Sequence, residues 1–227
     1  MLHCGVPNPP APPIDPTPHN CRDVTQLERY RERVKESRGW ILERRGSSMG
    51  SMAGDGVFIR GEVPMGSVVS LYSGLVYRNS DEFLKSYVAE NGSAYLMARY
   101  DGMIVDGIYG AGDREESRDI EQFALGEIVN HPNKGELPNV YTAQFRYPEH
   151  LERGLALYIP TRYCHDKPQT WLPSLVNTNT MPGIAMVAAR DIGDGEELLL
   201  NYRLNPAGEL PEWYHQVDKE EDARRWS

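Results

Sequence analysis

Short runs of apolar residues, separated by glycine and proline, recur along the middle of the chain. They are rich in Val, Ile, Leu and Tyr, which is typical of strands bounded by turns. Helical segments interrupt the series only rarely, and strand and helix do not alternate regularly. The pattern therefore predicts a mainly β, largely antiparallel domain with small helical insertions, rather than a Rossmann architecture. We expect strands at 54–60, 67–72, 74–77, 94–100, 103–106, 139–147 and 183–189.

A smaller number of segments have helical patterns. The longest begins at Asp23, which can form a capping box with Gln26, and runs to about Arg38 with apolar residues on one face. We interpret Glu43–Gly46 as a basic turn and 148–182 as a long excursion between strands. Shorter helices are expected at 81–90, 117–125 and 211–226.

Composition divides the chain into parts. Seven of the 17 prolines lie before position 20, and proline both removes amide donors and fixes φ, so this segment is expected to be disordered. The C-terminal end is rich in charged residues. We expect a leader at 1–22, a helix at 23–39, one domain at 40–205 and a charged tail at 206–227.

Charge and cysteine content narrow the classes of partner. A formal net charge of −9 leaves no overall positive field to attract nucleic acid or an anionic membrane, whereas a lysine-rich peptide is compatible with it. The longest apolar stretch, near 183–189, is far shorter than the ~20 residues that span a bilayer. Cys4, Cys21 and Cys164 have neither disulfide nor metal spacing. We therefore expect a soluble, intracellular protein with no metal and no nucleic-acid or membrane partner.

Three short motifs contain residues suited to binding a ligand. Gly54-Asp55-Gly56 lets the backbone approach a ligand closely, because glycine has no Cβ. Asn130-His131, followed by Pro138-Asn139-Val140, offers amide, imidazole and backbone groups for hydrogen bonds. The third motif runs from Arg190 through a glycine turn and two glutamates to Tyr202. Taken alone, each motif is typical of an ordinary turn or loop.

In this order, the three motifs resemble the SET domain family of protein lysine methyltransferases. The resemblance extends from about Trp40 to about Asn205 and includes the 64–74 stretch and the Tyr100-Asp101-Gly102 and Asp106-Gly107 pairs. It implies a β-clip fold whose C-terminal segment forms a pseudoknot. It also implies that S-adenosyl-L-methionine binds on one face, while a lysine of a protein or peptide substrate enters a channel from the other.

The resemblance also assigns roles to residues. Tyr202 corresponds to the active-site tyrosine, and Tyr72 stands where many family members have a second tyrosine in the channel. Glu196 and Glu197 resemble an acid–base pair by residue type, but we interpret them as capping the turn and anchoring the fold. The residues expected to bind the cofactor are Gly54, Asp55, Gly56, Asn130, His131 and Tyr202.

The sequence departs from the family pattern in two places. The loop between Asn130-His131 and Pro138-Asn139 is expanded. No cysteine-rich segment flanks the domain, so the tail at 211–227 would have to cover the lysine channel. A second asparagine cluster, Asn177-Thr178-Asn179, lies only 19 residues before Glu196, too close for the strand pair that separates these motifs in the family.

Two alternatives to a methyltransferase stay open. The first is a SET-like module that has lost activity and only binds a peptide, which the expanded loop favours. The second is a β-rich structural protein whose motifs match by chance. The sequence does not specify the substrate, the number of methyl groups added, the compartment or the oligomeric state.

Overall fold

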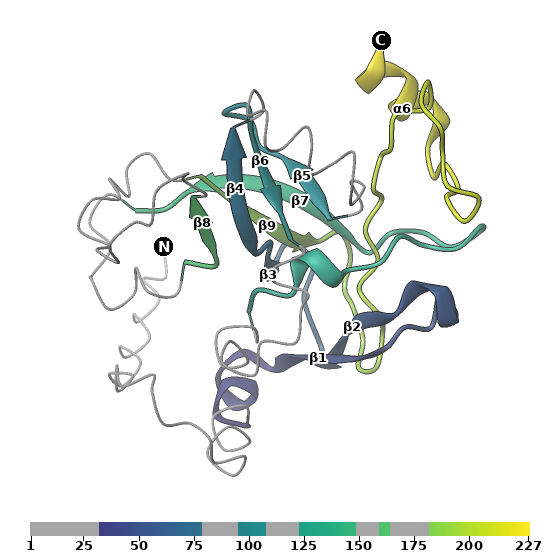
Figure 1. Ribbon diagram of the computed structural model, residues 1–227. Coiled ribbons are helices and arrows are strands. Elements are labelled where there is room, and N and C mark those ends of the chain that lie inside the picture. The colour runs from purple at the N-terminus through teal and green to yellow at the C-terminus, as the bar shows by residue number, and fades with distance from the viewer. Residues whose placement is uncertain (1–31, 79–94, 108–122, 149–158, 164–181) are drawn as a thin grey trace, which may run out of the picture.

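The computed structural model describes residues 32–78, 95–107, 123–148, 159–163 and 182–227. The expected leader, the start of the N-terminal helix, the helix at 81–90 and the Asn177 cluster lie outside these ranges. Within them, strands greatly outnumber helices, which confirms the predicted mainly β fold (Figure 1). No helix in these ranges has the length and apolar character needed to cross a membrane.

The described strands form three small sheets. All pairs are antiparallel except β4 with β8. The first sheet is a hairpin of β1 (Trp40–Gly46) and β2 (Asp55–Gly61). The second has the order β3 (Val68–Leu71), β9 (Pro182–Ala188), β7 (Val140–Arg146). The third has the order β5 (Leu96–Ala98), β6 (Met103–Asp106), β4 (Gly74–Arg78), β8 (Thr161–Tyr163).

The core is centred on β9 and β2. Every residue of β9 is buried, as its uninterrupted apolar sequence requires for a central strand with both faces covered. In β2, Val57 and Ile59 are completely buried, and they pack in the same cluster as Met186 and Leu198. The two short 3-10 helices, η1 (Ser51–Ala53) and η2 (Gly126–Ile128), lie in connections between strands.

Two of the predicted turns and loops contain strands. Glu43–Gly46, interpreted as a turn, is the second half of β1, and Arg45 lies opposite Gly56 in β2. The charged side chains of this half of the strand are exposed, so the hairpin gives no apolar signal there. The predicted excursion at 148–182 contains β8, which pairs parallel with β4.

The helix ends follow their capping residues. Residues 32–38 are helical and end at Arg38 as predicted, where Gly39 has φ +87° and donates its N–H to Lys35 O at 2.7 Å. The tail helix α6 (Lys219–Trp226) starts later than predicted, because the Asp218 carboxylate caps it by accepting from Glu220 N and Glu221 N. Residues 123–125, predicted as the end of a helix, are not helical.

The segment that carries the third motif lies between the two limbs of the 130–139 loop. Leu200 N donates to Asn130 O on one limb at 2.8 Å, and Asn139 N on the other limb donates to Leu199 O at 3.0 Å. The Asn139 side chain fastens the segment further, donating to Glu197 O and accepting from Leu199 N, both at 2.7 Å. This is the arrangement expected of a C-terminal pseudoknot, and it places the 197–202 segment beside the motif residues.

Candidate functional site

The carboxylate of Glu197 is the central hydrogen-bond acceptor of the site. It accepts hydrogen bonds from Ser47 Oγ at 2.7 Å, Ser48 N at 2.7 Å and Asn130 Nδ2 at 3.2 Å, and from the Ser48 hydroxyl. One buried carboxylate therefore joins the β1–β2 loop, the Asn130 limb and the pseudoknot segment. These contacts agree with the anchoring role expected of Glu197.

Glu196 has a different environment on the surface. It forms an ion pair with Arg190 at 2.6 Å and accepts from Gly193 N at 2.7 Å. The hydrogen bond from Arg190 lowers the pKa of this carboxyl below its ordinary value. Glu196 therefore holds the turn before the pseudoknot, and the two adjacent glutamates have separate sets of partners.

The two glycines of the first motif serve different purposes. A Cβ at Gly56 would lie 2.0 Å from Glu197 Oε1, so glycine is needed there for the carboxylate to reach its partners. Gly54 has φ +66°, and a Cβ there would meet nothing within 4 Å. Between them, Asp55 pairs its carboxylate with Arg44 at 2.8 Å and accepts from Asn130 Nδ2 on its carbonyl at 2.9 Å. Open space therefore adjoins Gly54, whereas Gly56 is closely packed.

Asn130 has its amide nitrogen committed to the protein and its amide oxygen available. The nitrogen donates to Asp55 O and Glu197 Oε1. Within the described ranges, its Oδ1 accepts no hydrogen bond, and the side chain is half-buried. The structure thus brings Asn130 together with the Gly54–Gly56 motif, as the sequence predicted, and leaves it one acceptor atom.

His131 is a neutral internal residue. Its Nδ1 accepts from Tyr202 N at 3.2 Å, and its Nε2 lies 2.8 Å from His215 O. A carbonyl oxygen can only accept, so Nε2 carries the proton and Nδ1 is bare. Burial lowers the pKa of this imidazole. Both ring nitrogens are used within the chain, so His131 can contact a ligand only through its backbone or the face of its ring.

Tyr202 and Tyr72 each donate their hydroxyl proton to a backbone carbonyl. Tyr202 Oη lies 3.0 Å from Val129 O, and Tyr72 Oη lies 2.6 Å from Tyr95 O. Burial raises the pKa of Tyr202 to about 12 and that of Tyr72 well above its ordinary value, with the Glu127 carboxylate and then Tyr202 adding to the shift at Tyr72. Both phenols therefore stay neutral, and each oxygen can only accept further hydrogen bonds.

The tail packs against the segment that carries Tyr202, a contact that sequence reasoning missed. Tyr214 stacks on His131 with ring centroids 4.5 Å apart, and its hydroxyl accepts from Leu204 N at 3.1 Å. Trp213, half-exposed, lies edge-on to Tyr202 at 6.1 Å. The run Trp213-Tyr214-His215 within an otherwise charged segment was the available signal.

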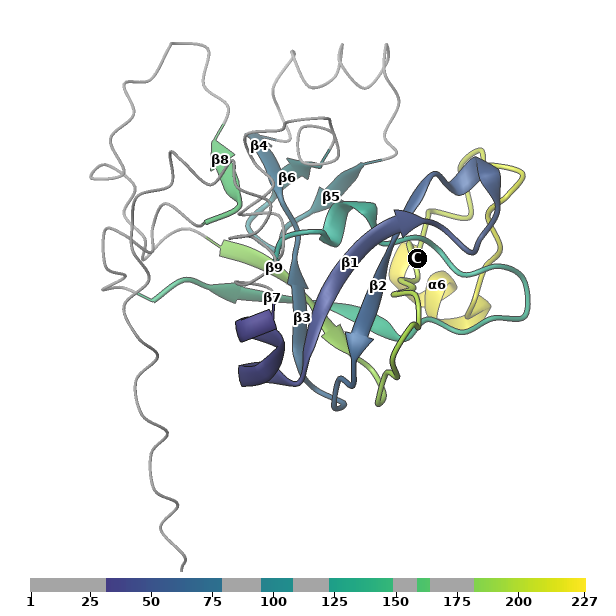
Figure 2. The ribbon, with the colours of Figure 1, turned by 90° about the horizontal axis from the view of Figure 1, so that it is seen from below.

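Arg203 holds the second part of the tail. Its guanidinium pairs with Glu221 at 2.7 Å, and its carbonyl accepts from Trp226 Nε1 at 3.1 Å. Among the described residues it is the one non-glycine with positive φ, at 50°. The tail and the β1–β2 loop project to the same side of the sheets (Figures 1 and 2).

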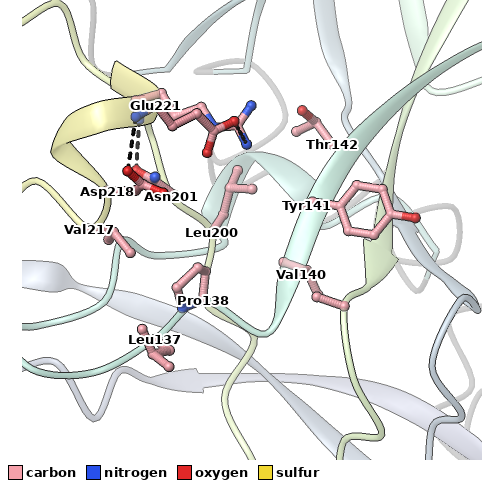
Figure 3. Close-up of a pocket in the computed structure, with 12 residues that line it drawn as sticks. Leu137, Pro138, Val140, Tyr141, Thr142, Leu200, Asn201, Val217, Asp218 and Glu221 are labelled. Carbon is pink, nitrogen blue, oxygen red and sulfur yellow. Dashed lines mark hydrogen bonds and ion pairs between the residues drawn. The ribbon is translucent and has the colours of Figure 1, made fainter. Parts of the chain in front are cut away.

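A pocket of about 330 Å³ lies between α6, the start of β7 and the pseudoknot segment (Figure 3). Asn201 and Arg203, on either side of Tyr202, line it, but Tyr202 and the other predicted site residues do not. It is therefore separate from the expected cofactor site. In the described ranges, His, Cys, Asp and Glu side chains nowhere gather in a group of three that could hold a metal ion.

Acidification is expected to destabilise the fold through His131. Its folded pKa is lowered, so the unfolded chain takes up a proton near pH 6.5 while the folded chain resists it. The contribution to stability is complete above about pH 6.5 and is lost as the pH falls from there toward the folded pKa. Melting temperatures measured between pH 7.5 and 5 should fall more steeply for the wild type than for His131→Gln. Parallel slopes would contradict the assignment.

Comparison with known proteins finds two similar sequences. No family model matches the sequence. Human SET domain-containing protein 9 is 28% identical over 174 residues, which cover 66% of this chain and 54% of that protein. The protein of the same name from Pongo abelii is 28% identical over 174 residues and 59% of its length. The chain is similar to proteins named for a SET domain.

These relatives carry the name of the SET domain, the family that the order of the three sequence motifs resembles. The chain spans about half the length of the curated relatives it matches. A solved structure from Plasmodium falciparum, described as that of a candidate histone methyltransferase, aligns with a TM-score of 0.39 and 14% identity over 71% of this chain and 92% of that one.

Proposed function

We propose that this chain transfers a methyl group from S-adenosyl-L-methionine to a lysine side chain of a protein. The observation that carries the proposal is two neutral phenols, the buried Tyr72 and the half-buried Tyr202, whose hydroxyl protons are both donated to backbone carbonyls. Two oxygens that can only accept are complementary to the N–H groups of an uncharged amine and to a methyl group on a sulfonium. They would repel a carbonyl or phosphate oxygen.

The residues around Gly54 fit the methyl donor. Open space adjoins Gly54. Asn130 Oδ1 accepts no hydrogen bond in the described ranges, so it can accept one from an N–H at the amino-acid end of S-adenosyl-L-methionine. The backbone of Gly54–Gly56 and the backbone or ring face of His131 would supply the other contacts. When bound, S-adenosyl-L-methionine supplies an electrophilic methyl group on a positively charged sulfur.

The chain's own residues would prepare the amine. A lysine in water has a pKa near ~10.4 and is charged at neutral pH, so it must lose a proton before it can act as a nucleophile. Removal from water disfavours its charged form and lowers that pKa. Tyr202 and Tyr72 would then orient the amine by accepting its N–H groups. Catalysis would come mainly from alignment in a preorganised polar cage.

Calorimetry tests whether the chain binds S-adenosyl-L-methionine. The full chain should bind S-adenosyl-L-methionine at one site without added metal, and the ligand should raise the melting temperature by mass action. The lack of both heat and thermal shift at millimolar concentration would overturn the proposal and favour the alternative below.

Asn130→Ala tests the assignment of the cofactor loop. The change removes the acceptor Oδ1 and leaves Asp55 O and Glu197 Oε1 without their shared donor. Loss of such hydrogen bonds costs ~1–3 kcal/mol, so the affinity for S-adenosyl-L-methionine should fall roughly tenfold or more. Asn177→Ala is the matched control and should be nearly neutral. If Asn177→Ala were the damaging change, the family loop would be misplaced.

The second candidate is a SET-like module that binds a peptide without methylating it. The expansion of the loop between Asn130-His131 and Pro138-Asn139 favours it, since it departs from the family pattern at the expected cofactor site. The loop forms a turn of its own, in which Glu136 N donates to Asn133 O at 3.0 Å and Asn133 N donates to Glu136 Oε2 at 3.1 Å. A peptide array incubated with a radiolabelled methyl donor distinguishes the two. Label on peptides supports the enzyme, and peptide binding without label supports the module.

A further inference from the structure

Basic residues lead directly into the β1–β2 loop of an otherwise acidic chain. Arg44 and Arg45 end β1 and are followed by Gly46, Ser47 and Ser48. The arginine side chains are 34% and 49% exposed, and Ser47 is half-buried while Ser48 is exposed. Serine kinases with an acidic substrate cleft select substrates by guanidinium groups shortly before the serine, through charge-assisted bonds to carboxylates. Relative to Ser47, the arginines stand three and two positions earlier.

The Ser47 hydroxyl is part of the hydrogen-bond network around Glu197. Its Oγ donates to Glu197 Oε1 at 2.7 Å and accepts from Met49 N at 3.0 Å, while Ser47 N donates to Gly54 O at 2.9 Å and closes the loop. The same Glu197 oxygen accepts from Asn130. One hydroxyl proton thus links the loop to the residue that holds Asn130.

We propose that Ser47 is a phosphorylation site for a serine kinase with an acidic substrate cleft, and that the phosphate detaches the β1–β2 loop from Glu197. The second part rests on the proposed function, since the loop borders the expected methyl-donor site. Ser47 Oγ forms a bond to the γ-phosphorus of ATP, the bond from that phosphorus to ADP breaks, and the hydroxyl proton passes to a carboxylate of the kinase. Atoms and charge balance with ATP as the only co-reactant.

The modified side chain cannot keep its place. A phosphoserine carries about −1.5 to −2 charge at pH 7 and has no hydroxyl proton to donate. At the present Ser47 position, its oxygens would face the Glu197 carboxylate, so attraction becomes repulsion between like charges. Ser47 and Ser48 would leave Glu197 together, because they bind its two oxygens from adjacent residues. The wall of the donor site next to Gly54 would then open.

The kinase has to open the end of the β1–β2 hairpin to reach this segment, because Arg44, Arg45 and Gly46 pair with β2. The side-chain contacts of the arginines that open with it include the pair of Arg44 with Asp55, the bond of Arg45 to Gly195 O at 3.3 Å and the stacking of Arg45 on Phe58, where the guanidinium carbon lies 3.8 Å from the ring centroid. Surface interactions of these kinds are weak, and carboxylates of the kinase replace them. The loop itself contains Gly50 and Gly54 in positive-φ conformations.

The first experiment tests the site. The full chain is incubated with the catalytic subunit of cyclic-AMP-dependent protein kinase, magnesium and ATP, and the product is mapped by tandem mass spectrometry. We expect one phosphate on Ser47, unchanged incorporation in Ser48→Ala and none in Ser47→Ala. Phosphate on Ser48, or no incorporation, would overturn the proposal.

The second experiment tests the effect on the loop without any ligand. Hydrogen exchange of amides 47–56 should become at least tenfold faster after phosphorylation of the wild type, and much less so in Glu197→Gln, which lacks the repelling charge. Unchanged exchange in the wild type would overturn the loop-opening step. Donor affinity should fall at least tenfold on phosphorylation. If the unmodified chain binds no donor, the proposed function fails, while mapping and exchange still decide the modification.

Discussion

Replacing Tyr202 with phenylalanine is expected to remove most methyl transfer while leaving the fold and donor binding in place. The change deletes the hydroxyl that bonds Val129 O and keeps the ring that packs near His131 and Trp213. If the Tyr202 oxygen orients the amine, loss of one preorganised contact costs ~3–4 kcal/mol of transition-state stabilisation, a hundredfold or more in rate. Single-turnover rates on a lysine peptide, or on the chain itself if it automethylates, measure this loss.

A packing role for Tyr202 predicts the opposite outcome. A residue that only fills space would tolerate loss of one oxygen, with activity near wild type. Tyr141→Phe, on the half-exposed face of β7, is the matched control for removal of a tyrosine hydroxyl and should change neither rate nor affinity. Equal rates and equal affinities for the methyl donor in Tyr202→Phe and the wild type would contradict a catalytic role for Tyr202 and make Tyr72 the next candidate.

The fold was predictable where burial produces a signal in sequence. β9 is buried along its whole length and reads as an uninterrupted apolar run, and β2 follows its glycine motif as expected. β1 was missed along its whole length, and its second half was interpreted as a turn, because the charged side chains there are exposed and only pairing with β2 makes it a strand. In α6, the start was set by the Asp218 cap rather than by the charged composition that suggested a longer helix.

The residues of the candidate site were predictable from the sequence, but the long-range hydrogen bonds between them were not. The order of the motifs identified Gly56, Asn130 and Tyr202, which the fold brings around one segment. The bond of Ser47 to Glu197 joins residues 150 apart in sequence, and the bond of His131 to His215 joins residues 84 apart. Neither contact leaves a local pattern, because a serine in a glycine-rich loop and a carbonyl in a tail look the same with or without a distant partner. These connections decide that His131 is internal and that Glu197 organises the site.

Gly56→Ala is expected to disrupt the hydrogen bonds around Glu197. The new Cβ would lie 2.0 Å from Glu197 Oε1 and 2.7 Å from its Cδ, so the carboxylate has to move and give up Ser47, Ser48 and Asn130. Overpacking of a closely packed position lowers the free energy of unfolding by ~1–3 kcal/mol, and the hydrogen-bond donors left unpaired add to this loss. Thermal melts should show a loss of several degrees, and calorimetry a fall in donor affinity of at least tenfold.

Two further variants distinguish a steric conflict with Glu197 from a general sensitivity of the loop to substitution. Gly54→Ala adds a Cβ that meets nothing within 4 Å, so its cost is the backbone strain of a side chain at φ +66° and ψ −131°, on the order of 1–3 kcal/mol, with no loss of the Glu197 bonds. In a Glu197→Ala background, Gly56→Ala should cost little further, because the atoms it strikes are gone. A double-mutant cycle measures this coupling. If the costs of Gly56→Ala and Glu197→Ala simply added, the glycine would serve something other than the carboxylate, and Glu197 would lose its place as the residue that organises the site.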